Sequence, residues 1–187
     1  MAACGGDDDS ATPTGGSSTP TSSAALSGTP ITTPAGSEGA PAVCTQEDAQ
    51  KGTITTLAFG DDKTNYDPGQ PIEMTFTIAN CGDVETTLTF PTTERYVFNA
   101  LDAAGNKVWS TEDGKVFNEI QGTEKIGVNK TIVYTETWDQ KDSNGQQVPD
   151  GQYKIQAFSV GCTSGQTGCH FGPVRFVLIG PIPSATS

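Results

Sequence analysis

The chain has 187 residues, about the size of one domain, and 34% of them are hydrophobic. Its 22 acidic residues against 10 basic ones argue against nucleic-acid binding, because phosphate contacts need clustered Lys and Arg. A multispanning membrane protein is excluded because no run approaches the roughly 20 apolar residues that cross a bilayer, and the single His leaves little room for His-based catalysis or a multi-His metal centre.

The first 43 residues differ in composition from the rest. All ten basic residues lie at or after Lys51, whereas residues 1–43 are nearly all Gly, Ser, Thr, Pro and Ala and carry only four acids. Such a segment cannot bury enough apolar surface to offset the entropy of ordering its backbone. We therefore predict a disordered tether over 1–43 and one folded domain over 44–183, whose 18 acids and 10 bases leave a net charge of about −8.

The N-terminus resembles the end of a bacterial lipobox. Ala2 and Ala3 precede Cys4 and Gly5, and an acidic run and a polar stretch follow, as in many surface lipoproteins. Cys4 is thus the predicted lipidation site, which implies export and a position at the outer face of the cell membrane or in the cell envelope. The alternative is a chance Ala-Ala-Cys at a cytosolic N-terminus. The count of five Cys favours the anchor, because one can be lipidated and four can pair.

The folded region begins with two predicted strands. Thr53–Phe59 is the first, and Ile72–Ile78 is the second, because its apolar and polar residues alternate without exception. Asp67–Gly69 lies before the second strand and has the residues of a turn, with Pro fixing one dihedral angle and Gly supplying a positive φ. We expect the two strands to pair as a hairpin.

Further strands follow at the roughly ten-residue spacing of a sandwich or barrel. Ala103–Asn106 predicts a hairpin turn, and Val116–Ile120 is expected to hold one short helical turn. The other predicted strands contain Leu88 and Phe90, Tyr96–Leu101, Lys107–Ser110, Ile132 and Tyr134, Tyr153–Ala157, and Val174–Leu178. No segment shows a sustained helical apolar stripe. The sequence therefore predicts an all-β fold, an immunoglobulin-like antiparallel β-sandwich of seven to nine strands.

The four remaining cysteines gather at one pole of such a sandwich. Cys44 precedes the first strand, Cys81 ends the second, and Cys162 and Cys169 lie in the last hairpin loop. More than one connectivity is open, and the simplest pairs Cys44 with Cys81 and Cys162 with Cys169. Disulfides need an oxidising compartment, which agrees with export.

No constellation of residues points to catalysis or to a bound cofactor. A Ser/His/Asp triad would have to use His170, which lies beside a predicted disulfide, and no G-x-S-x-G elbow occurs. The acids around Asn144-Gly145 suggest a calcium loop, but EF-hand spacing puts Gln140 and Gly151 where acidic oxygens are required. We expect no catalytic residue, no metal and no cofactor, and hence no enzyme.

A series of short motifs runs through the folded region in a fixed order. They are Tyr66–Pro71 with the alternating strand and Asn80–Asp83, Leu88–Phe98, Val108–Ser110, Gly114-Lys115 with Phe117, Tyr134–Asp139, and Val148–Tyr153. In order and spacing this series, from Thr53 to Val160, resembles the intracellular proteinase inhibitor (BsuPI) family. Glu94 stands where that family usually has Gln, and Val97 where Asp is common.

The resemblance implies a protein that inhibits serine proteases by binding. Such an inhibitor presents a rigid loop that fills the protease cleft, with one side chain in the specificity pocket. The Pro91–Arg95 turn is one candidate, with Arg95 or Tyr96 as the inserted side chain. The Cys162–Cys169 loop is another, because a disulfide would pre-organise it. Arg95 and Tyr96 are equally consistent with a strand start and a core residue.

The alternative is a non-enzymatic immunoglobulin-like structural or adhesion module of a cell-surface lipoprotein, displayed to protein partners or carbohydrate. The two hypotheses share several expectations. Both predict a monomer that contacts the membrane through its lipid anchor only and binds no nucleic acid. Under the first hypothesis the protein partner is a serine protease.

Overall fold

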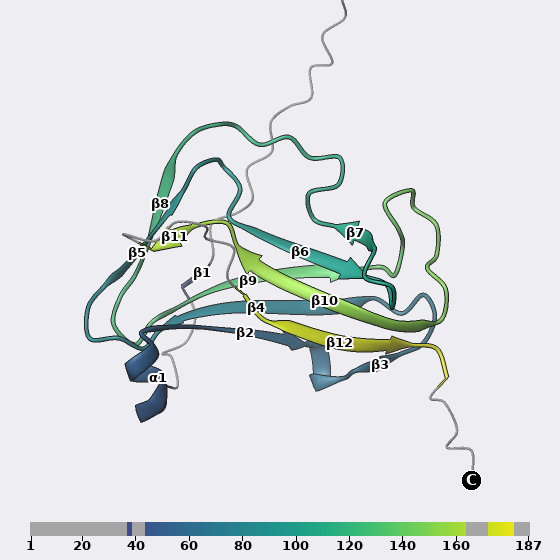
Figure 1. Cartoon of the computed structure of the whole chain (residues 1–187), viewed down its shortest axis with the longest axis horizontal. Coiled ribbons are helices and arrows are strands. Elements are labelled where there is room, and N and C mark those ends of the chain that lie inside the picture. The colour runs from purple at the N-terminus through teal and green to yellow at the C-terminus, as the bar shows by residue number, and fades with distance from the viewer. Residues whose placement is uncertain (1–36, 39–43, 164–171, 182–187) are drawn as a thin grey trace, which may run out of the picture.

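The computed structural model describes residues 37–38, 44–163 and 172–181 (Figure 1). Apart from β1 (Ser37–Glu38), the segment predicted to be a disordered tether lies outside these residues, as do Cys4, Cys169 and His170. The described part consists mainly of strands, which confirms the all-β class.

Two larger sheets face each other, and a smaller third sheet lies at one end of the molecule (Figure 1). The first has the order β1-β9-β4-β2, the second β3-β12-β10-β6-β7 and the third β11-β5-β8. The strands after β1 are β2 (Thr53–Phe59), β3 (Asn65–Tyr66), β4 (Ile72–Asn80), β5 (Thr86–Phe90), β6 (Tyr96–Leu101), β7 (Lys107–Ser110), β8 (Gly122–Ile126), β9 (Thr131–Trp138), β10 (Gly151–Ser159), β11 (Cys162–Thr163) and β12 (Val174–Ile179). All pairs are antiparallel except β3 with β12. The described residues contain nine strands of four or more residues, so the predicted sandwich is confirmed.

The core lies between the two larger sheets. On β4 the alternation places Ile72, Met74, Phe76 and Ile78 inside, each at most 1% exposed. Phe76 meets Phe98 of β6 in the opposite sheet edge to face, with ring centroids 6.3 Å apart. Such aromatic contacts add to the energy of apolar burial and hold the two layers in one register.

The predicted pairing of the first two strands is confirmed, although their connection is longer than a tight hairpin. Strands β2 and β4 are antiparallel neighbours. Between them the chain forms the 3-10 turn η1 (Gly60–Asp62), the short strand β3 and the Asp67–Gly69 turn. In that turn the Gln70 amide donates to Asp67 O at 3.0 Å, and Gly69 has the expected positive φ of 80°. The Ala103–Asn106 hairpin between β6 and β7 is also present, with Gly105 at φ 87°.

Three elements differ from the sequence predictions. The helical turn expected at Val116–Ile120 is wrong, because the backbone there bonds to another loop and not to itself. Strand β8 was not predicted, since its sequence Gly-Thr-Glu-Lys-Ile buries only Ile126 fully. The short helix α1 (Gln46–Lys51) buries no residue and begins at a capping box formed by Thr45 and Asp48, a local signal without an apolar stripe.

The Cys44–Cys81 disulfide is confirmed, with Cα atoms 5.6 Å apart. It joins the start of α1 to the end of β4, and the Cys81 amide donates to Gly52 O at 2.7 Å beside it. Because Cys169 lies outside the described residues, its pairing with Cys162 stays a prediction.

Candidate functional site

Tyr96 lies in the core between the two larger sheets. It is 3% exposed, its ring contacts that of Tyr134 at 4.6 Å between centroids, and its hydroxyl donates to Glu136 Oε1 at 2.8 Å. Burial, followed by the bond to Glu136, holds the pKa of the Tyr96 hydroxyl well above its ordinary value. This is the position of a core residue, one of the two interpretations that the sequence allowed.

Arg95 contacts two strands of the third sheet, β5 and β8. Its side chain is 14% exposed, and its Nε lies 3.2 Å from Glu124 Oε1 on β8. The guanidinium stacks over the Phe90 ring at 4.5 Å, and Nη1 donates to Thr92 O at 2.9 Å. Glu124 also accepts the Tyr134 hydroxyl at 2.8 Å. The side chains of Arg95 and Tyr96 are therefore both largely buried. Their role in a protease-binding loop stays a prediction.

The residues next to Arg95 support a long open segment, residues 115–121, which links β7 to β8 across the top of Figure 1. Its backbone contains neither turn nor bend. At its centre the Thr93 amide donates to Asn118 O at 2.9 Å, and the Asn118 amide donates to the Thr93 hydroxyl at 3.1 Å. At its end, Gly122 lies so close to Arg95 that a Cβ there would be 2.6 Å from Nη2. We call these residues the 115–121 segment.

The 115–121 segment exposes apolar side chains. Val116 is 61% and Ile120 62% exposed, in a protein whose described large apolar side chains are mostly buried. An apolar side chain held at the surface by a fixed backbone is the kind of feature that marks a binding site.

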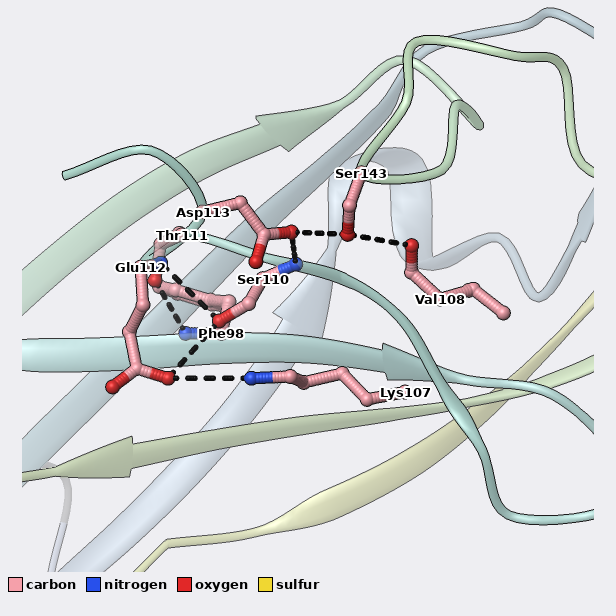
Figure 2. Close-up of polar contacts among 8 residues, drawn as sticks. All are labelled: Phe98, Lys107, Val108, Ser110, Thr111, Glu112, Asp113 and Ser143. Carbon is pink, nitrogen blue, oxygen red and sulfur yellow. Dashed lines mark hydrogen bonds and ion pairs between the residues drawn. The ribbon is translucent and has the colours of Figure 1, made fainter.

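The start of this connection is tied to the loop between β9 and β10, as Figure 2 shows. Asp113 Oδ2 accepts the Ser110 amide at 2.8 Å and the Ser143 hydroxyl at 2.6 Å. The Ser143 amide donates to Val108 O at 2.9 Å. The tip of the β9–β10 connection is therefore bonded to the start of the β7–β8 connection, 30 residues away in the sequence.

The β9–β10 connection, which we call the 139–150 loop, is held from beneath by Gln140. This side chain is fully buried. Its Oε1 accepts the Gly69 amide at 2.7 Å, and its Nε2 donates to Asp67 O at 2.9 Å and Gln70 O at 2.7 Å. A buried amide with all its groups bonded fixes the loop against the Asp67–Gly69 turn.

The tip of the 139–150 loop is held in a turn by Asp142. Its Oδ1 accepts the amides of Asn144 and Gln146 at 2.9 and 2.8 Å. The bond from Gln146 is the largest cause that lowers the pKa of Asp142. This is the polar turn that the sequence favoured over a calcium loop. Over residues 44–163 and 172–181 there is no group of three His, Cys, Asp or Glu side chains that could hold a metal ion.

Glu94 is a half-buried acid near the start of the 115–121 segment. Desolvation, followed by repulsion from Glu112, raises the pKa of Glu94 from 4.5 to about 7, against a lowering by Lys115. Its Oε1 is buried and has no hydrogen-bond partner within the described part of the chain. Glu94 forms one wall of a 430 Å³ concavity, which is also lined by Thr89, Pro91, Thr92, Gln121, Val160 and Cys162.

Sequence reasoning missed the residues that organise these loops. Thr93 and Asn118 are 25 positions apart, and Gln140 bonds to residues some 70 positions away, so no local pattern reveals either contact. The predicted lipidation site Cys4 lies outside the described residues. No helix in the described ranges is long and apolar enough to cross a membrane.

Comparison with solved structures gives likenesses at low sequence identity. The alkylpurine DNA glycosylase AlkC of Pseudomonas fluorescens, bound to DNA with an abasic site analog, aligns with a TM-score of 0.38 and 9% identity over 68% of this chain and 30% of its own. The CARDB domain of a Pyrococcus furiosus protein, in complex with di-metal ions, gives 0.37 and 13% over 68% and 87%. The sporulation control protein Spo0M of Bacillus subtilis gives 0.42 and 10% over 71% and 51%. Comparison with curated proteins gives no match.

Comparison with family models is more informative. The BsuPI model, described as intracellular proteinase inhibitor, matches residues 61–163, more than half of the 187-residue chain. The matched region contains Arg95, Tyr96, the 115–121 segment and the 139–150 loop. The chain belongs to the intracellular proteinase inhibitor (BsuPI) family.

Proposed function

We propose that this protein inhibits serine proteases by stoichiometric binding. The observation that carries the proposal is the pair of hydrogen-bonded loops within the family region, joined by the bond between Ser143 and Asp113 (Figure 2). A binding inhibitor needs a surface that keeps its shape when the protease closes on it. The 139–150 loop is held through Gln140 and Ser143, and the 115–121 segment is held through the two bonds between Asn118 and Thr93.

Rigidity matters because of the energetics of association. A protein–protein interface of standard size buries about 1,600 Å² and must overcome the entropy of ordering its loops. The bonds of Thr93, Gln140 and Asp113 order the loops during folding, so that less conformational entropy is lost when the protease binds. Stable binding then needs fewer favourable contacts with the protease.

The proposal includes a place of action outside the cytoplasm. Cys4 follows two small residues and precedes a polar stretch, which supports a lipid anchor. The Cys44–Cys81 disulfide is also of a kind that persists in oxidising compartments. In this setting the domain would act on proteases that reach the cell surface.

The test is a titration of proteases with the purified full chain. Subtilisin-like, chymotrypsin-like and trypsin-like enzymes are each mixed with increasing amounts of the protein, and residual activity is followed with a small chromogenic substrate. Activity should fall linearly and reach its end point at a fixed molar ratio with at least one class. Full activity of every class at micromolar protein would overturn the inhibitor proposal and favour the structural or adhesion module.

The anchor has its own test. The protein is isolated from membranes of its native host, and its N-terminal peptide is weighed by mass spectrometry, with Cys4→Ala as the matched variant. A lipidated Cys4 at the mature N-terminus is the expected result, together with release of the variant into the medium. An unmodified Cys4 behind an intact Met1 would refute the anchor and leave the inhibition assay unaffected.

A further inference from the structure

We infer that the 115–121 segment is the part of this protein that enters the protease cleft, and that it selects proteases with an apolar specificity pocket. The inference rests on the proposed inhibitory function and names the contact and the partner class for it. It follows from three properties of the segment: its backbone, its side chains and its supports.

The backbone of the segment is irregular, and most of its peptide groups make no hydrogen bond to the described residues. From Val116 to Gln121 it contains neither turn nor bend, and its only hydrogen bonds to the described residues are those that Asn118 makes with Thr93. The peptide groups on either side of Asn118 therefore have no partner in the described part of the chain. An open backbone with unused donors and acceptors is what a protease cleft recognises, because extended peptides bind by adding a strand to a partner.

The side chains of the segment provide the apolar contact. Val116 and Ile120 are both more than 60% exposed, and each can be buried by a partner. No Arg lies in the segment, and its one Lys, Lys115, stands at its start. An aliphatic side chain suits the apolar pocket of subtilisin-like and chymotrypsin-like enzymes, whereas a trypsin-like pocket holds a carboxylate that requires a cation.

The supports of the segment hold it in place from both sides. Thr93 fixes its centre, and the pair of Arg95 and Glu124 fixes the strand that follows. Asp113 fixes the chain before it. Arg95 thus acts as a positioning residue, from beneath the segment, in the same region where sequence reasoning placed an inserted side chain.

The 139–150 loop is the other candidate, and its chemistry is less suitable. Its tip bonds to itself through Asp142, and its exposed side chains from Asn144 to Gln147 are polar amides. It supports its neighbour through Ser143 and offers no exposed apolar side chain at its tip.

The experiment compares single variants of the full chain against a protease that the unchanged protein inhibits. Val116→Asp and Ile120→Asp place a carboxylate on the segment, and each should weaken inhibition at least about tenfold, because an apolar pocket rejects a charge. Val84→Asp is the matched control. Val84 is 68% exposed on the connection between β4 and β5, outside both loops, and its substitution should leave the inhibition constant within about twofold.

Two further measurements keep the test decisive. Thermal unfolding and near-ultraviolet circular dichroism show whether each variant is folded. If Val116→Asp is not folded, Val116→Thr replaces it, because Thr has nearly the same shape as Val. Inhibition unchanged in both segment variants, or weakened equally by Val84→Asp, would overturn the inference while the proposed function stands. If the unchanged protein inhibits no protease, the proposed function fails first, and the two failures are thereby distinguished.

A change of specificity gives a positive readout. Val116→Arg or Ile120→Arg should shift inhibition toward trypsin-like enzymes for whichever side chain occupies the pocket, by about tenfold or more relative to a chymotrypsin-like enzyme. The same ratio in both Arg variants as in the unchanged protein would contradict the assignment of the segment to the pocket.

Discussion

The 115–121 segment and the 139–150 loop belong to two connections that the bond between Asp113 and Ser143 joins, yet they use their polar groups in opposite ways. The 139–150 loop buries the amide of Gln140, bonds to its own backbone through Asp142 at its tip, and exposes polar side chains. The 115–121 segment is bonded to Thr93 at its centre, through Asn118, and exposes aliphatic side chains. The difference indicates two roles, in which the 139–150 loop supplies rigidity and the 115–121 segment supplies the contact with a protease.

The largest expected effect on this difference comes from removing Gln140, which fixes the 139–150 loop to the Asp67–Gly69 turn. Gln140→Leu removes three hydrogen bonds, to the amide of Gly69 and to the carbonyls of Asp67 and Gln70, and at about 1 kcal/mol for each bond it should lower the free energy of unfolding by about 3 kcal/mol. Denaturation in urea, followed by Trp fluorescence, measures this loss. Gln146→Ala, at the exposed tip, should change it by less than about 0.5 kcal/mol. Equal effects of the two substitutions would show that Gln140 does not anchor the loop.

The support of the 115–121 segment comes next. Arg95→Met removes the cation that pairs with Glu124, a largely buried carboxylate on β8. We expect a loss of about 2–3 kcal/mol in the free energy of unfolding. Lys125→Met removes a neighbouring ion pair to Glu85 whose side chains are 67% and 51% exposed, and it should leave the free energy of unfolding nearly unchanged. A loss for Arg95→Met as small as that for Lys125→Met would contradict a bracing role. Both values come from the same urea titration.

Glu94, whose charge interacts with Lys115 of the 115–121 segment, makes the stability of the protein sensitive to pH. Because burial raises its pKa in the folded protein from 4.5 to about 7, the folded state binds the proton more tightly than the unfolded state. Its contribution is neutral below pH about 4.5, turns unfavourable as pH rises, and levels off above pH about 7. After allowance for solvent screening we expect a decline of about 1–2 kcal/mol across this range.

The matched variant for this prediction is Glu94→Gln, which keeps the shape and removes the titration. Stability measured by urea unfolding at intervals between pH 4.5 and 8 should be flatter for the variant than for the unchanged protein. A difference between the two proteins that does not vary with pH would rule out Glu94 as the group responsible.

The smallest effect concerns the hydroxyl of Thr93. Thr93→Val removes the acceptor of the Asn118 amide and should cost about 1 kcal/mol, while hydrogen exchange of the Asn118 amide becomes faster. Thr93→Ser keeps the hydroxyl and should protect this amide as the unchanged protein does. If Thr93→Val exchanges no faster than Thr93→Ser, the centre of the segment is held by something other than this bond.

Sequence patterns predicted the strands of the sandwich well and its loops poorly, for a physical reason. The alternation of Ile72–Ile78 and the boundaries of Tyr96–Leu101 follow from burial on one face of a sheet, which repeats every second residue. The supports of the loops depend on single polar contacts between distant residues, such as Thr93 with Asn118, and these leave no periodic trace. The Cys44–Cys81 pairing is the simplest of the connectivities that the topology leaves open, because it places four cysteines at one pole.

The same disulfide has a mechanical consequence. A pull on the chain from the N-terminal side of Cys44 passes through the covalent bond to Cys81, which follows β4, and bypasses the residues between them. Strand β4 is paired on both sides, by β2 and β9, so such a force would have to shear two rows of hydrogen bonds at once. The edge strand β2 cannot be peeled away first, because it lies inside the closed covalent loop.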